Sequence, residues 1–275
     1  MPITRGIVGS AVVSPFRTLV VHRDVIEIFV RRDVQSRYIN SALGLWWAVI
    51  QPLALLALFT FVFSGIMKMR LGERDGTGEF ALYLFCGLLP WLAFSDAVTR
   101  SSSVIVEQTP LIKKVLFPSE ILPVHLVLSA LVVEAAGLAV FLAAMVALGR
   151  PPGWALAALP VVIALQVVFT AGVAWLMAAV AVFLRDTRHV VGLGLTLWLF
   201  LTPIMYSDSL VPDRYRWILA VNPMAYVVEA YRSALLQNEL PAAVPSAVFA
   251  GVAFAAFVSG HWVFVRSKRA FADLL

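Results

Sequence analysis

The sequence predicts an all-α membrane protein with six transmembrane helices and an amphipathic helix before them. Three observations support this prediction: 61% of the 275 residues are hydrophobic, only 13% are charged, and the mean hydropathy is +0.90. Soluble domains carry about a quarter charged residues. A surface this apolar requires lipid as its solvent, and in lipid an unclosed chain satisfies its own backbone only as helices.

The first patterned segment, residues 16–38, predicts a two-faced helix. Apolar residues recur there at helical spacing, while Arg17, Asp24, Arg31 and Gln35 lie on the other side. A basic helix of this kind is typical of one that lies in the headgroup plane. A plain juxtamembrane role and a mechanical role stay equally open. We expect residues 1–40 to form a cytoplasmic N-terminal region.

Six apolar stretches follow, each long enough or nearly so to cross the bilayer, which takes about 20 residues. With the N-terminus inside, Lys and Arg are about twice as frequent on the cytoplasmic side as outside, which supports this orientation. Both termini are then cytoplasmic, with residues 266–275 as a tail. The predicted spans are residues 41–67, 80–100, 121–148, 154–184, 190–206 and 244–265.

A seventh apolar segment, residues 217–236, is interrupted by Asn222 and Pro223. Proline removes a backbone donor and pushes the residue before it away from helical geometry. The segment therefore predicts two half-helices joined by a turn, which enter the membrane from the outer side and return. Counting it as a full span would place the basic C-terminus outside, against the positive-inside tendency.

Catalytic and nucleotide-binding motifs are missing from the sequence. It contains no GxxxxGK[ST] phosphate loop, no HExxH and no GxSxG, its four histidines are scattered, and Cys86 is its single cysteine. We expect no catalytic residues, no metal site and no cofactor bound by this chain. The net charge of +5 reflects membrane orientation, and no nucleic-acid partner is expected.

Three ionisable residues fall inside or near the predicted spans: Asp96, His125 and Glu134. Charges at depth often mark transport paths. Asp96 precedes Arg100 by four residues, which favours an ion pair on the helix surface. His125 is interpreted as interfacial. For Glu134, a neutral structural carboxyl and a functional one are equally open.

Aromatic residues are frequent, with eight Trp in the chain. Those near span ends suit an interfacial belt. Deeper ones offer stacking faces to sugar rings, although packing against helices or lipid is favoured for any single residue. The candidates for lining a channel are Phe59, Phe63, Tyr83, Trp91, Phe94 and Trp198.

The loop between the second and third spans contains a short amphipathic insert, EQTPLIKKVLFPSE, at residues 107–120. Pro110 and Pro118 bound it, and apolar residues flank Lys113 and Lys114. Such a helix can dock into a groove on a soluble partner. Lying on the membrane surface is an equally open alternative.

The order of six segments gives the chain a family resemblance: SRYINSALGLWWAVIQPL (36–53), LFCGLLPWLAFSDAV (84–98), TPLIKKVLFPSEILP (109–123), FLRDTRHVV (183–191), LWLFLTPIMY (197–206) and NPMAYVVEAYRSALL (222–236). Together they resemble the permease subunits of type-2 ABC exporters of polysaccharides, in particular the O-antigen and teichoic acid exporters. One departure is Ser207 after Tyr206, where related exporters often continue with proline.

The resemblance implies a non-enzymatic permease in the inner membrane. It implies a homodimer bound to two cytoplasmic ABC ATPases, which would hold the ATP and Mg²⁺. The substrate would be a lipid-linked polysaccharide such as an O antigen. Teichoic acid, capsule glycan, or a small drug or lipid are the alternatives, and an embedded enzyme is disfavoured because the loops are short and poor in carboxylates and histidines.

The resemblance also implies roles for particular residues. Residues 109–120 match a coupling helix that sits in the ATPase cleft, and residues 16–38 match an interface helix. The residues implied in ATPase coupling are Leu111, Ile112, Lys113, Lys114, Phe117, Arg185, Asp186 and Arg188. Residues 217–236 match a re-entrant pair that closes the outer end, with Asn222, Pro223, Glu229 and Arg232 as its gate residues.

Overall fold

The computed structural model describes residues 15–37, 43–67, 79–114, 118–184, 186–208 and 211–274, and all regular structure in these ranges is helical. The predicted all-α class is therefore confirmed. Four described helices are long and apolar enough to cross a membrane, and two further apolar helices are shorter, Trp47–Val62 and Thr187–Leu201. The four long ones are Glu79–Glu107, Ile121–Ala147, Trp154–Phe183 and Ala243–Phe271.

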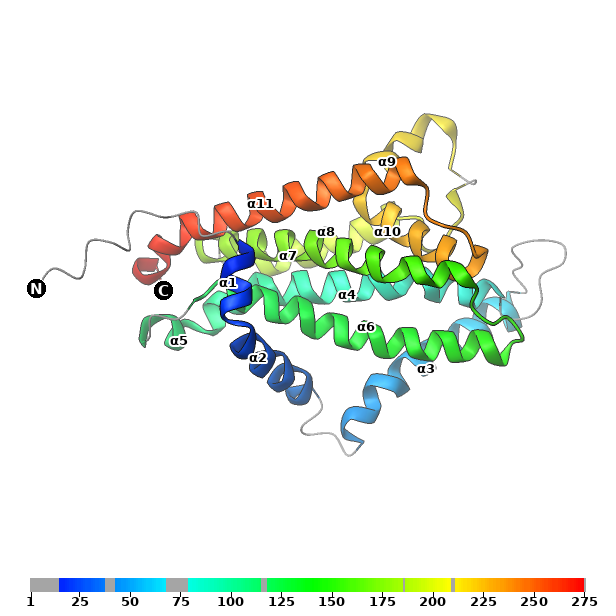
Figure 1. Ribbon diagram of the computed structural model, residues 1–275, viewed down its shortest axis with the longest axis horizontal. Helices are drawn as coiled ribbons and strands as arrows, with labels where there is room; N and C mark the ends of the chain where they lie inside the picture. Colours follow the sequence, from blue (N-terminus) through cyan, green and yellow to red (C-terminus); the bar gives the residue numbers. More distant parts are fainter. Residues whose placement is uncertain are drawn as a thin grey trace, which may run out of the picture.

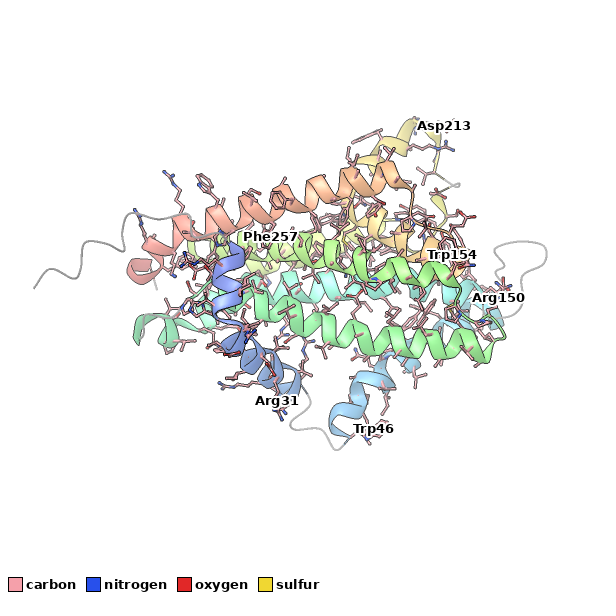
Figure 2. All side chains as sticks on the ribbon, viewed as in Figure 1. Arg31, Trp46, Arg150, Trp154, Asp213 and Phe257 are labelled. Atoms are coloured by element: carbon pink, nitrogen blue, oxygen red, sulfur yellow. The ribbon has the colours of Figure 1, made fainter. Side chains whose placement is uncertain are left out.

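The body of the molecule is a bundle of long helices lying side by side (Figure 1). It consists of α4 (Glu79–Glu107), α6 (Ile121–Ala147), α7 (Leu159–Phe183) and α11 (Ala243–Leu274). A shorter helix, α8 (Thr187–Leu201), packs against α4 and α7. Bulky side chains such as Phe85, Phe141 and Trp175 fill its interior. The shorter helix α3 (Trp47–Phe59) contacts α4 and α6 and diverges from the bundle toward its N-terminal end, where Figure 2 labels Trp46.

Most helix ends lie close to the ends of the predicted apolar stretches, and one helix is shorter than expected. The six crossings themselves stay a prediction. Helix α4 runs past the predicted end at Arg100 to Glu107, and α11 continues through the predicted tail to Leu274. Helix α8 ends at Leu201 rather than near Tyr206. Thr202 is extended (ψ 132°), as expected for a residue preceding a proline, here Pro203. Helix α6 begins at Ile121, where the third stretch was predicted to begin. At the start of the fourth stretch, the short 3₁₀ helix η3 (Trp154–Ala158) precedes α7.

The N-terminal helix is divided, so the prediction of one helix over residues 16–38 is wrong. The structure has α1 (Pro15–Val21) and α2 (Arg23–Ser36), separated at His22, whose φ of −106° and ψ of 21° are not helical. The His22 ring bonds the Thr18 carbonyl oxygen at 2.9 Å. Helix α2 crosses α6 obliquely, with Arg31 pointing away from the bundle (Figure 2). Tyr38 lies outside the described residues.

The predicted coupling helix, residues 109–120, is shorter than expected. The helix α5 covers Thr109–Lys114, and a turn at residues 118–120 leads into α6. Residues 115–117 lie outside the described ranges. Helices α1 and α5 and the C-terminal end of α11 lie at the same end of the bundle (Figure 1), and Arg150 and Trp154 lie at the other (Figure 2).

Helices α7 and α11 approach each other unusually closely. A Cβ atom added to Gly260 would overlap the Gly172 carbonyl group, and one added to Gly172 would overlap the backbone of Ala256. Ala256 and Gly260 are four residues apart, the small-residue spacing that lets membrane helices pack backbone to backbone. This crossing accounts for the extensive contact between the two helices.

Replacing Gly260 by Ala should destabilise the protein, because a methyl group there has no space and overpacking costs about 1–3 kcal/mol. The measurement is the melting temperature of the purified protein in detergent. Gly251→Ala on the same helix is the control, since a Cβ at Gly251 meets open space. Equal melting temperatures for both variants would contradict the close crossing.

Candidate functional site

A cluster of four charged residues joins the surface helix α2 to α4. Arg37 Nη2 donates to Asp96 Oδ2 at 2.6 Å, and Arg100 Nη1 donates to Asp33 Oδ2 at 2.9 Å. The predicted pair on one helix, Asp96 with Arg100, is confirmed at 3.8 Å. The shorter contacts run between helices, however, and sequence spacing gave no signal for Asp33 or Arg37. The cluster therefore fixes α2 against the bundle.

Asp33 is held in its charged form within this cluster. Burial raises the pKa of Asp33, but the hydrogen bonds and positive charge of Arg100, with a contribution from Ser129, outweigh burial and lower the pKa below its usual value. A carboxyl whose pKa is lower in the folded state stabilises the fold above the pKa of the unfolded chain. That stabilisation is lost as the pH falls through the lowered pKa.

The predicted coupling residues that the structure describes gather at the α5 end of the bundle. Leu111 and Ile112 are half-buried and pack against the cluster of buried residues that contains Trp175 and Phe264. Arg188 reaches Glu107, at the end of α4, at 3.8 Å, and both side chains are mostly exposed. Asp186 is exposed before α8 and makes no side-chain cap. Phe117, Arg185 and the side chains of Lys113 and Lys114 lie outside the described residues.

The start of α6 is tied to two other helices at this same end. Lys268 Nζ on α11 donates to Glu120 Oε2 at 2.9 Å, and Trp175 Nε1 on α7 donates to the Glu120 carbonyl at 2.9 Å. The turn that follows the α5 segment is therefore held by both neighbours.

The predicted break at Asn222 and Pro223 is confirmed, with α9 (Arg216–Val221) on one side and α10 (Pro223–Arg232) on the other. Asn222 Oδ1 accepts from the Met224 amide at 3.0 Å and from Trp198 Nε1 at 2.8 Å. Its Nδ2 donates to the Leu201 carbonyl at 3.2 Å. Asn222 thus caps α10 and bonds it to the end of α8, and Pro223 takes the first helical position, where its missing donor costs nothing.

Arg232 is buried at the far end of α10, with a side chain stretched across to the segment after α8. Its Nη1 and Nη2 donate to the carbonyls of Pro203 and Ile204 at 2.6 and 2.8 Å. Its guanidinium lies 3.6 Å from the centroid of the Tyr83 ring. These two carbonyls lie in the turn after α8, and a buried backbone carbonyl needs a donor. Glu229, by contrast, is exposed and accepts from Gln237 Nε2 at 3.4 Å.

Glu134 belongs to a closed ring of three buried polar groups, which we call the polar ring: Glu134 on α6, Gln166 on α7 and Tyr231 on α10. The Tyr231 hydroxyl lies 2.6 Å from Glu134 Oε1 and 2.8 Å from Gln166 Oε1. Gln166 Nε2 lies 3.0 Å from Glu134 Oε2. No sequence pattern predicted Gln166 or Tyr231 as partners of Glu134.

The polar ring needs a proton on Glu134 to be complete. The ring has one contact between each pair of its members, and each of these three contacts needs one hydrogen. The tyrosine hydroxyl supplies the hydrogen for one contact and the glutamine amide for another. The third contact has a hydrogen only if the Glu134 carboxyl is protonated, and this holds for both orientations of the amide. The alternative of a neutral structural carboxyl at Glu134 is therefore the one that the geometry favours.

The candidate channel aromatics fall into two groups. Trp91 and Phe94 are only 3% and 0% exposed and pack against Trp198 with ring centroids 6.1 and 5.3 Å away, so both are interior residues of this conformation. Phe59, Tyr83 and Trp198 are partly buried. The side chain of Phe63 lies outside the described residues. The lining of a channel by these residues stays a prediction.

These features define a helical membrane protein in which the deeply buried carboxyl of Glu134 is neutral within the polar ring. The described residues contain no group of three His, Cys, Asp or Glu able to hold a metal. Residues 25–236 match the ABC-2 type transporter family, and the chain belongs to it. It is 31% identical over 259 residues to the O-antigen export system permease protein RfbA of Myxococcus xanthus, covering 94% of this chain and 97% of that one.

Two further relatives extend the comparison. An RfbA protein of Klebsiella pneumoniae is 26% identical, covering 92% of this chain and 95% of its own length. The polysialic acid transport protein KpsM of Escherichia coli is 23% identical, covering 78% of this chain and 83% of its own.

Replacing Glu134 by Gln should leave stability nearly unchanged, because an amide also supplies the missing hydrogen. Glu134→Ala should cost about 1–3 kcal/mol, since it leaves buried partners unsatisfied. Thermal unfolding in detergent measures both. A Gln variant as unstable as the Ala variant would show that the ring requires a charged carboxylate.

Replacing Asp33 by Asn should cost about 1.5–3 kcal/mol at neutral pH, because Arg100 loses a charged acceptor. The wild-type advantage should disappear as the pH falls below about 4. Unfolding at a series of pH values tests this. Asp24→Asn on the same helix is the control, since the Asp24 side chain is 84% exposed. An equal loss of stability in Asp33→Asn and Asp24→Asn would refute a specific role for the cluster.

Proposed function

We propose that this chain is the transmembrane subunit of an ATP-driven exporter that moves a lipid-linked polysaccharide of the O-antigen kind from the cytoplasm across the inner membrane. The observation that carries the proposal is the similarity, over more than nine-tenths of both chains, to permease proteins named for O-antigen export. The ABC-2 match over residues 25–236 and the four long apolar helices agree with it.

The proposed topology has six crossings with both termini in the cytoplasm. The four long helices make four of them. Helix α3 with the π-helix η2 (Thr60–Ile66) provides 13 and 7 residues, or roughly 30 Å, enough for a fifth. Helix α8, with 15 residues, makes the sixth together with the turn-containing segment that follows it, residues 202–206. The end that carries α1, α2 and α5 is then the cytoplasmic one.

The proposed assembly is a homodimer with two ATPase subunits below it, and ATP and Mg²⁺ are held by those subunits. The sequence has no phosphate loop of its own, so the energy must come from a partner. The exposed apolar face of α8, which includes Val190, Leu193, Leu197 and Phe200, offers surface to a second copy. Helix α5 and Arg188 lie at the end proposed to be cytoplasmic, and the ATPase is proposed to dock there.

The broken segment α9–α10 is the proposed outer gate. Asn222 and Arg232 bond α10 to the end of α8, so a shift of α8 is transmitted to it. The partly buried aromatics Phe59, Tyr83 and Trp198 would offer weak, successive contacts to a passing glycan, as conduction requires.

A capsule polysaccharide is the second candidate substrate, because KpsM proteins are also relatives. Teichoic acid, a drug or a lipid are less directly supported. Deleting the gene separates these possibilities: loss of surface O antigen with intact capsule supports the first, and the reverse supports the second. Unchanged surface glycans would overturn the proposed function.

Reversing charge and polarity in the α5 region should uncouple the permease from its ATPase. Lys113→Glu and Phe117→Asp should reduce surface polysaccharide and co-purification of the ATPase by about tenfold, the effect of losing 1.4 kcal/mol of binding. Leu111→Asp should do the same, although Leu111 also packs against the bundle. Gln108→Glu, just before α5, is the matched control. Normal export and stoichiometry in Lys113→Glu and Phe117→Asp would reject the coupling role.

A further inference from the structure

Glu120, the residue immediately before α6, bonds two other helices at once. Its carboxylate accepts two hydrogen bonds from Lys268 Nζ on α11, at 2.9 Å to Oε2 and 3.0 Å to Oε1. Its backbone carbonyl accepts from Trp175 Nε1 on α7 at 2.9 Å. The Glu120 side chain is only 12% exposed, so its carboxylate depends on Lys268 for a counter-charge.

The bond to Lys268 joins two helices that otherwise share little packing. Helix α7 packs against both α6 and α11, whereas α6 and α11 have few direct contacts in the described residues. The C-terminal part of α11 lies at the same end of the bundle as α5 (Figure 1). The ion pair of Glu120 and Lys268 is therefore a direct link between the start of α6 and the end of α11.

Trp175 strengthens this link because it is itself embedded in α11. Its ring is fully buried, with centroids 5.0 Å from the Phe257 ring and 4.9 Å from the His261 ring. The two helices cross backbone to backbone nearby, at Gly172 and Gly260. We call them the α7–α11 pair. A displacement of the start of α6 is thus passed to both helices of this pair.

The α5 segment comes directly before this link in the chain. Residues 118–120 form the turn between α5 and α6, and the Ile121 amide donates to the Pro118 carbonyl at 3.0 Å. The apolar contacts of α5 itself are non-directional and permit sliding. Separating Glu120 from Lys268, by contrast, leaves a largely buried carboxylate without its cation, which is costly.

We propose that Glu120 and Lys268 are positioning residues of the transport cycle, and that their ion pair passes the movement of the α5 segment to the α7–α11 pair. The ATPase moves α5, the start of α6 follows through the turn, and Lys268 carries α11 and α7 with it. This inference rests on the proposed function and adds the route by which force leaves the α5 segment.

Reversing the charge at position 268 tests the route. Lys268→Glu should lower surface polysaccharide by about tenfold, because two carboxylates then repel each other between α6 and α11. ATP hydrolysis by the purified permease–ATPase complex in nanodiscs and co-purification of the ATPase should stay at the wild-type level, since α5 is unchanged. Arg269→Glu, the same charge reversal at the exposed neighbouring residue, is the matched control and should export normally.

Three further variants separate transmission from folding. Adding Glu120→Lys to Lys268→Glu restores opposite charges in swapped positions and should recover most of the export. Lys268→Arg keeps the charge and a donor, so it should export at the wild-type level. Lys268→Met keeps the length of the side chain without its charge and should lower export, although its melting temperature should match that of the wild type.

Two results would overturn the role of this ion pair while leaving the proposed function intact. One is normal export by a folded Lys268→Met complex. The other is a parallel fall in melting temperature, ATP hydrolysis and export in Lys268→Glu, since that pattern indicates a purely structural contact. If deleting the wild-type gene leaves surface glycans unchanged, the proposed function fails, and the role of the ion pair fails with it.

Discussion

Hydrocarbon offers no hydrogen-bond partner to a broken helix, and this constraint determines the outer half of the structure. Helix α8 stops at Leu201 and leaves carbonyls free, while α10 begins after a break and leaves amides free. Side chains satisfy both ends. The hydroxyl groups of Thr202 and Tyr206 and Nδ2 of Asn222 bond the last carbonyls of α8. Asn222 Oδ1 accepts from the first amides of α10, and Arg232 bonds the carbonyls of Pro203 and Ile204 in the segment after α8. Asn222 therefore serves both breaks.

Neighbouring residues on α10 connect it to opposite parts of the bundle. Tyr231 enters the polar ring with α6 and α7, and Arg232 turns to Tyr83 on α4 and the segment after α8. Burying the polar ring in an apolar interior costs little free energy only because every contact in it has a hydrogen and it carries no net charge. At the other end of the molecule, charged groups remain charged because they pair near the surface, as Asp33 does with Arg100.

Long apolar runs predicted α4, α6, α7 and α11 well, since a run of about 20 apolar residues has few alternatives to a helix in lipid. The break before Pro223 was equally predictable, because proline acts locally. The division at His22 was not predicted, because the apolar pattern continues through it. The end of α8 before Pro203 carried the same local proline signal as the break before Pro223, and it was missed because the apolar run continues to Tyr206. The partners of Glu134 could not be found from spacing, since Gln166 and Tyr231 lie 32 and 97 residues away and only tertiary packing joins them.

The crossing of α7 and α11 at Gly172 and Gly260 has no side chain between the two backbones. Close backbone packing leaves little room for either helix to roll there, so we expect α7 and α11 to move as one unit. Helices α3 and α8, with large exposed faces and shorter lengths, have no such backbone crossing in the described residues. We therefore expect α3 and α8 to shift more readily than the α7–α11 pair.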